Sequence, residues 1–135
     1  MRNATIRGIL AVILGWVAGS IVNMGIIMLS SSVIPLPEGV IPGDMDSLKA
    51  NIHLFEGKHF IMPFLAHSLG TLVGAIVAAR IAMSNKHIFA MVIGVLFFIG
   101  GIMVNQQLGI TGTPMWVDLI LAYFPFALFG YKIAK

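Results

Sequence analysis

Three stretches of this chain carry no Asp, Glu, Lys or Arg over lengths that can cross a lipid bilayer. They are residues 8–37, 59–79 and 88–117. About 20 consecutive apolar residues are needed for a helix to cross the hydrocarbon core. A fourth apolar stretch, residues 115–131, contains one charge, Asp118. The sequence therefore predicts four transmembrane helices, at about residues 6–31, 60–83, 88–107 and 115–134.

The composition places the chain among proteins that are solvated by lipid. Hydrophobic residues make up 59 % of it, which is high for a soluble core of this length. We expect one all-α domain over residues 1–135, an integral membrane four-helix bundle. The net charge of +3 comes from residues that flank the helices, and no basic face with interleaved aromatic residues is present, so no nucleic-acid partner is predicted. The absence of cysteine excludes disulfides, thiolate catalysis and Cys-ligated metals.

The charged residues predict how the helices are oriented. Six basic residues lie at the two termini and between the second and third helices: Arg2, Arg7, Arg80, Lys86, Lys132 and Lys135. All five acidic residues lie at the opposite ends of the helices: Glu38, Asp44, Asp46, Glu56 and Asp118. By the positive-inside rule both termini are cytoplasmic. The first apolar run continues to Leu29, which is too long for a signal peptide, so we expect a retained first helix.

The first outer loop is expected to contain a short amphipathic helix. Its beginning, VIPLPEGVIPGD, is rich in proline and glycine and favours an irregular course. Asp44 or Asp46 can cap a helix that follows, and Gly57 suits the position just past its end. Apolar residues recur at helical spacing between them: Leu48, Ile52 and Phe55. The stripe is too short to span a membrane and is typical of a helix lying at the interface.

Small residues predict where the helices pack. They recur at four-residue spacing on the first and second helices: Gly15 and Gly19, then Gly70, Gly74 and Ala78. Such rows let helix backbones approach closely in lipid. The partner helix belongs either to the same chain or to another, so we also expect a homo-oligomer or a subunit of a larger membrane complex. Trp16 falls at mid-depth and is expected to pack between helices.

The fourth helix contains a proline that interrupts its hydrogen bonding. Pro125 has no N–H to donate to the Leu121 carbonyl and is expected to kink the helix.

Each predicted helix carries one strong hydrogen-bonding side chain in its outer half: Asn23, His67, Asn105 and Asp118. Polar groups in hydrocarbon are unfavourable unless paired, so their shared depth predicts one cluster. We expect the Asp118 carboxylate to accept a hydrogen bond from His67, with Asn23 and Asn105 completing the network. The network either fixes helix register or forms an outward-facing ligand pocket. The pocket would comprise Asn23, His67, Thr71, Asn105 and Asp118.

A second group of polar residues lies in the outer loop. His53, Glu56 and His59 are spaced by three residues, and imidazole and carboxylate are suitable zinc ligands. On a helix this spacing spreads the side chains over an arc of about 120°, and Gly57 interrupts it. Interfacial histidines therefore remain the favoured interpretation, with a metal site as the alternative. No cofactor is predicted.

The segment Lys58–Ala82, KHFIMPFLAHSLGTLVGAIVAARIA, together with the four-helix pattern resembles small uncharacterised proteins of the bacterial inner membrane. The resemblance implies that location and carries no activity. We predict a non-enzymatic bundle that self-associates or joins a complex and binds a small ligand or lipid headgroup. One alternative is a membrane enzyme with His67 and Asp118 as an acid–base pair, or with the outer-face metal site. The other is a transporter or channel subunit.

Overall fold

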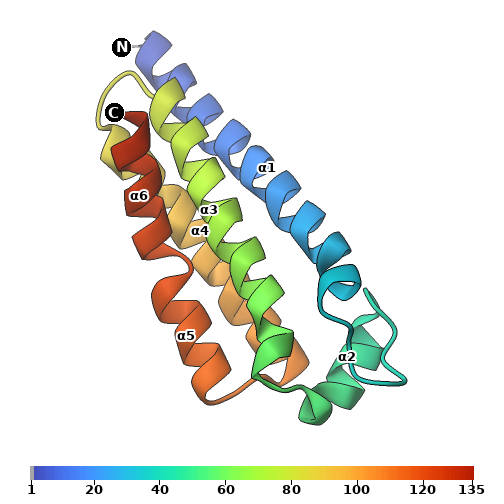
Figure 1. Ribbon diagram of the computed structural model, residues 1–135. Coiled ribbons are helices and arrows are strands. Elements are labelled where there is room, and N and C mark those ends of the chain that lie inside the picture. Colours follow the sequence, from blue (N-terminus) through green and yellow to red (C-terminus); the bar gives the residue numbers. More distant parts are fainter. Residues whose placement is uncertain (1) are drawn as a thin grey trace.

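The computed structural model describes residues 2–135, with side chains from residue 3. All of its long elements are α-helices (Figure 1). These are α1 (Arg2–Val33), α3 (Ile61–Ile81), α4 (Lys86–Leu108), and the consecutive pair α5 (Thr113–Leu121) and α6 (Phe124–Ala134). Shorter elements lie between α1 and α3: α2 (Met45–Asn51) and the 3-10 turns η1 (Ile52–Leu54) and η2 (Gly57–Phe60). Four segments of 31, 25, 23 and 22 residues are long and apolar enough to cross a membrane. The predicted all-helical bundle with four such helices is confirmed.

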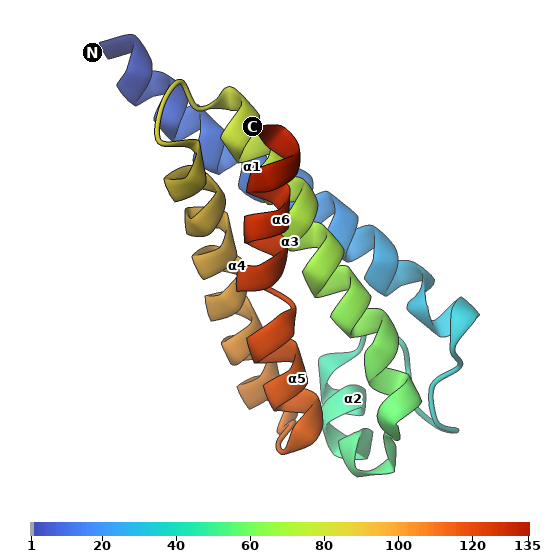
Figure 2. The same ribbon diagram turned by 60° about the vertical axis from the view of Figure 1, so that its left-hand side comes forward.

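The helices run side by side, with α3 in the middle of the bundle. It contacts α1, α4, α5 and α6, whereas α1 contacts mainly α3 and, less extensively, α4. Both termini lie at one end of the bundle with the turn at residues 82–85, and we call this the terminal end (Figure 1, Figure 2). At the opposite end, the loop end, lie α2 and the turn at residues 109–112.

Glycines bring α1 and α3 into backbone contact. A Cβ atom added to Gly15 would lie 2.7 Å from the carbonyl oxygen of Gly74, and one added to Gly74 would lie 2.7 Å from the carbonyl oxygen of Gly15. One turn along, Gly70 meets the carbonyl oxygen of Gly19 in the same way, at 2.8 Å. Ala78 is fully buried at the same interface. The small residues of these two helices therefore face each other within one chain.

The fourth apolar segment is interrupted at Ala122 and Tyr123 rather than smoothly curved. Pro125 lies in the first turn of α6, where its missing N–H is tolerated. Helical hydrogen bonding resumes when the Ala127 N–H donates to the carbonyl oxygen of Tyr123 at 2.8 Å. The helix expected at residues 115–134 is thus two helices joined by a short break.

Most of the outward surface of α1 is apolar. Large side chains exposed along it include Ile9, Ile13, Val17, Ile21, Met24 and Met28. Trp16 is among them, with 53 % of its surface exposed, so the prediction that it packs between helices is wrong. The interior side of α1 is formed by its glycines instead, because a tryptophan would hold α1 away from α3.

The short helix of the loop begins where the sequence indicated and ends earlier. The Asp44 carboxylate caps α2 by accepting a hydrogen bond from the Ser47 N–H at 3.1 Å. The helix stops at Asn51, and Ile52 and Leu54 lie in the tighter turn η1.

Candidate functional site

A hydrogen-bonded cluster of three side chains connects α3 to α5 near the loop end. One oxygen of the Asp118 carboxylate is hydrogen-bonded to His67 Nδ1 at 2.7 Å. The other accepts a hydrogen bond from the Tyr123 hydroxyl at 2.8 Å. Asp118 is 8 % exposed and Tyr123 is 1 % exposed. The rings of His67 and Tyr123 stack with their centroids 5.7 Å apart. We call these three residues the carboxylate cluster.

The break in the fourth apolar segment is what completes this cluster. Residues five positions apart on an unbroken helix point about 140° away from each other. Because the helix is interrupted between Leu121 and Phe124, the Tyr123 hydroxyl turns back to Asp118. The Tyr123 hydroxyl fits against α4 because residue 101 is a glycine, since a Cβ atom at Gly101 would overlap the hydroxyl. Phe98 closes the same side with an edge-on contact to the tyrosine ring.

The cluster has a defined pattern of donors and acceptors. A carboxylate is an acceptor only, so the hydrogen bonds assign one proton to His67 Nδ1 and one to the Tyr123 hydroxyl. The other ring nitrogen, Nε2, has no hydrogen bond to any described residue. The arrangement fixes α3 against α5.

The other polar residues predicted for a pocket do not join the cluster. The Thr71 hydroxyl donates to the His67 carbonyl oxygen of its own helix at 2.7 Å. Asn105 is buried, but its amide donates to the Gly101 carbonyl oxygen, also within its own helix, at 2.8 Å. Asn23 lies against Gly70, and its Oδ1 is buried without a hydrogen-bond partner in the described part of the chain. The expectation that Asn23 and Asn105 complete the network around Asp118 is therefore corrected.

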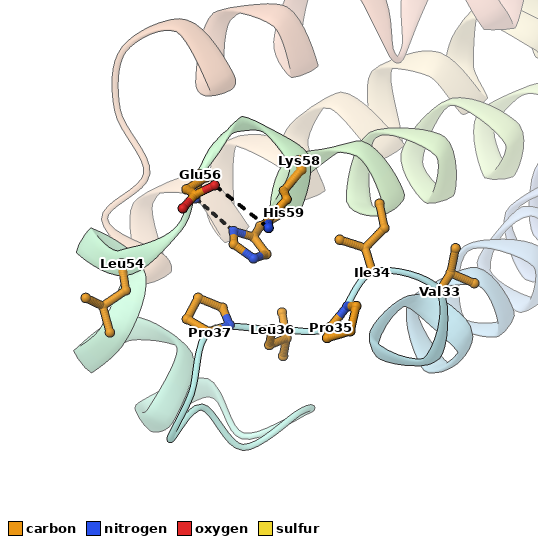
Figure 3. Close-up of a pocket in the computed structure, with 9 residues that line it drawn as sticks. All are labelled: Val33, Ile34, Pro35, Leu36, Pro37, Leu54, Glu56, Lys58 and His59. Atoms are coloured by element: carbon orange, nitrogen blue, oxygen red, sulfur yellow. Dashed lines mark hydrogen bonds and ion pairs between the residues drawn. The ribbon is translucent and has the colours of Figure 1, made fainter.

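A hollow of about 430 Å³ lies at the loop end, where α1 finishes and η2 leads into α3 (Figure 3). We call it the loop-end hollow. Six apolar and three polar residues line it: Val33, Ile34, Pro35, Leu36, Pro37 and Leu54, with Glu56, Lys58 and His59. It is separate from the carboxylate cluster, which contributes none of these residues.

Two of the polar residues of the hollow form a reciprocal cap at the start of η2. The Glu56 N–H donates to His59 Nδ1 at 2.8 Å, and the Glu56 carboxylate accepts from the backbone N–H of His59. His59 is 8 % exposed. Lys58 lies beside them, with its Nζ 3.9 Å from a Glu56 oxygen.

The structure does not bring the three predicted metal ligands, His53, Glu56 and His59, together around one point. His53 is exposed on η1, and the Nδ1 lone pair of His59 is occupied by the Glu56 N–H. Within residues 3–135, no group of three His, Cys, Asp or Glu side chains is arranged to hold a metal ion.

Tyr123 and the loop-end hollow were missed by reasoning from sequence. The position of Tyr123 two residues before Pro125 was a usable signal. Beside a helix break caused by proline, the regular rotation of about 100° per residue no longer predicts which way a side chain points. The hollow has no comparable signal, since an irregular segment with no periodicity forms half of its wall.

No family model, curated protein or solved structure matches the chain, so its function is inferred from the arrangement of its own residues.

Proposed function

We propose that this chain is an integral protein of the bacterial cytoplasmic membrane, with both termini in the cytoplasm, and that it binds a small ligand or lipid headgroup at its loop end without catalysing a reaction. The four long apolar helices support the membrane location. The charges support the orientation, because basic residues flank the terminal end and acidic residues gather at the loop end. The loop end then faces outward.

The observation that carries the ligand-binding proposal is the loop-end hollow. Ligand sites usually have volumes of about 300–1,000 Å³, mainly apolar walls and a few polar groups that orient the ligand. The hollow has about 430 Å³, and its lining combines six apolar residues with three polar ones. It also lies where α1 ends and α3 begins, which in a membrane is the level of the lipid headgroups.

The orientation can be tested with reporters that are active only in the cytoplasm. Reporters fused after Lys135 or inserted at Asn85 are expected to be active, because both positions lie at the terminal end. The same reporter inserted at Gly43, an exposed position of the outer loop, is expected to be inactive. Activity at Gly43 together with inactivity at Lys135 would invert the proposed orientation.

Ligand binding can be tested by the lipid that the protein retains. We expect protein purified in mild detergent to keep about one bound phospholipid per chain, and added lipid extract to raise its unfolding temperature, since a ligand that binds only the folded state stabilises it. Native mass spectrometry measures the first quantity and a thermal scan the second. A chain that emerges free of lipid and is not stabilised by any lipid fraction would refute the proposed function.

A further inference from the structure

The loop-end hollow contains a hydrogen-bond donor that the described residues leave without an acceptor. His59 Nδ1 accepts from the Glu56 N–H, so the neutral ring carries its proton on Nε2. Figure 3 shows the ring extending from η2 toward Pro35–Pro37, with Nε2 on the side of that segment. No described residue accepts from this nitrogen, although the residue is more than nine-tenths buried. The proton on Nε2 is therefore available to an acceptor from outside the chain.

The rim of the hollow carries one charge of each sign. The Lys58 ammonium and the Glu56 carboxylate lie 3.9 Å apart, and their side chains are 60 % and 72 % exposed. A headgroup that bears only negative charge would bring a second anion close to Glu56, which is unfavourable. A headgroup that bears both a phosphate and an ammonium can place each beside the residue of opposite charge.

The wall distinguishes between two kinds of ammonium group. Quaternary ammonium groups such as choline are bound by cages of aromatic rings. The hollow is lined by aliphatic side chains and prolines, and His59 contributes the only ring with π-electrons among the residues that line it. A primary ammonium instead needs hydrogen-bond acceptors, which the Glu56 carboxylate supplies.

We propose that the loop-end hollow binds the zwitterionic headgroup of a phosphatidylethanolamine-type lipid. The phosphate accepts a hydrogen bond from His59 Nε2 and faces Lys58, the primary ammonium faces Glu56, and the first part of the acyl chains lies against the aliphatic wall. This assignment rests on the proposed function and adds to it the class of lipid and the residues that select it.

The wild-type test compares lipids with identical acyl chains and different headgroups. Phosphatidylethanolamine, phosphatidylglycerol and phosphatidylcholine are added separately to the delipidated full-length protein in mild detergent, and binding is measured by native mass spectrometry. We expect phosphatidylethanolamine to bind about tenfold more tightly than either of the others. Phosphoethanolamine without acyl chains is expected to compete poorly, and effective competition by it would overturn the assignment to a lipid.

Two variants test the individual contacts while preserving the cap of η2. His59→Asn keeps an oxygen near the position of Nδ1 that can accept from the Glu56 N–H, but it lacks the Nε2 proton. We expect it to bind phosphatidylethanolamine about tenfold more weakly, with an unchanged unfolding temperature in the absence of lipid. Glu56→Gln keeps an oxygen for the His59 N–H and loses the charge, so we expect it to lose the preference for phosphatidylethanolamine over phosphatidylglycerol.

Asp46→Asn is the matched control, because Asp46 is an exposed acidic residue of α2 that does not line the hollow. It is expected to keep both the affinity and the preference of the wild type. If the wild type binds lipid and both His59→Asn and Glu56→Gln retain its affinities, the assignment of the headgroup to the hollow is overturned while the proposed function stands. If the wild type binds none of the three lipids, the headgroup assignment is overturned, and the proposed function fails as well if no lipid fraction stabilises the protein.

Discussion

Replacing Asp118 by leucine is expected to lower the free energy of unfolding by about 1–3 kcal/mol for each hydrogen-bond donor that it leaves without an acceptor. The carboxylate accepts hydrogen bonds from both His67 and Tyr123. Leucine leaves the Tyr123 hydroxyl buried without an acceptor, because Gly101 and Phe98 close the space around the tyrosine ring, and it removes the acceptor of the part-buried His67. Unfolding in mixed micelles of a mild detergent and dodecyl sulfate measures the change.

A combination of substitutions tests whether the three residues act as one unit. His67→Leu and Tyr123→Phe each remove one of the donors that Asp118→Leu leaves unpaired. The triple variant should therefore lose less stability than the sum of the three single variants. Asp46→Asn, at an exposed position, should change the free energy of unfolding by no more than about 0.5 kcal/mol. Strict additivity of the three substitutions would mean that the carboxylate cluster does not exist as described.

Replacing Gly74 by leucine is expected to separate α1 from α3. Its Cβ atom alone would lie 2.7 Å from the Gly15 carbonyl oxygen and 3.0 Å from the Ile93 side chain, and the contact with Gly15 is with backbone, which cannot move aside alone. Overpacking usually destabilises by about 1–3 kcal/mol, and we expect the upper end of that range here. The same unfolding experiment measures the loss.

Gly25→Leu on α1 provides the matched control for this prediction. No atom lies within 4 Å of a Cβ atom added at Gly25, so the leucine meets open surface. Its stability should equal or slightly exceed that of the wild type, because leucine favours a helix more than glycine does, by up to about 1 kcal/mol. Wild-type stability in Gly74→Leu combined with a loss in Gly25→Leu would place the interface on the wrong side of α1.

The positions of the helices follow from the sequence because a single physical requirement sets them. A stretch without charges that is long enough to cross the hydrocarbon core must satisfy its backbone groups internally, and a helix does this with local hydrogen bonds. The break before Pro125 is equally local, since a proline cannot donate the bond that a continuous helix needs. The capping of α2 by Asp44 also depends only on neighbours in the chain.

Which side of each helix faces inward was decided by the tertiary structure. α1 is apolar on all sides, so its periodicity shows which residues share a face and does not show which face is buried. Trp16 is outside for this reason, and Asn105 is bonded within α4 although it seemed suited to meet Asp118. An amide has a backbone carbonyl within reach in its own helix, and only the packed arrangement decides whether it uses that carbonyl or another side chain.

The sequence also predicted only part of the carboxylate cluster and none of the loop-end hollow. The pairing of His67 with Asp118 was predicted because two buried polar groups at one depth need each other, and this need can be read from the sequence. The role of Tyr123 depends on the break between α5 and α6 and on the space beside Gly101 of another helix. The hollow depends on how an irregular segment folds back over η2. Such contacts join residues far apart in the chain through side-chain shape, which no local pattern of residue types encodes.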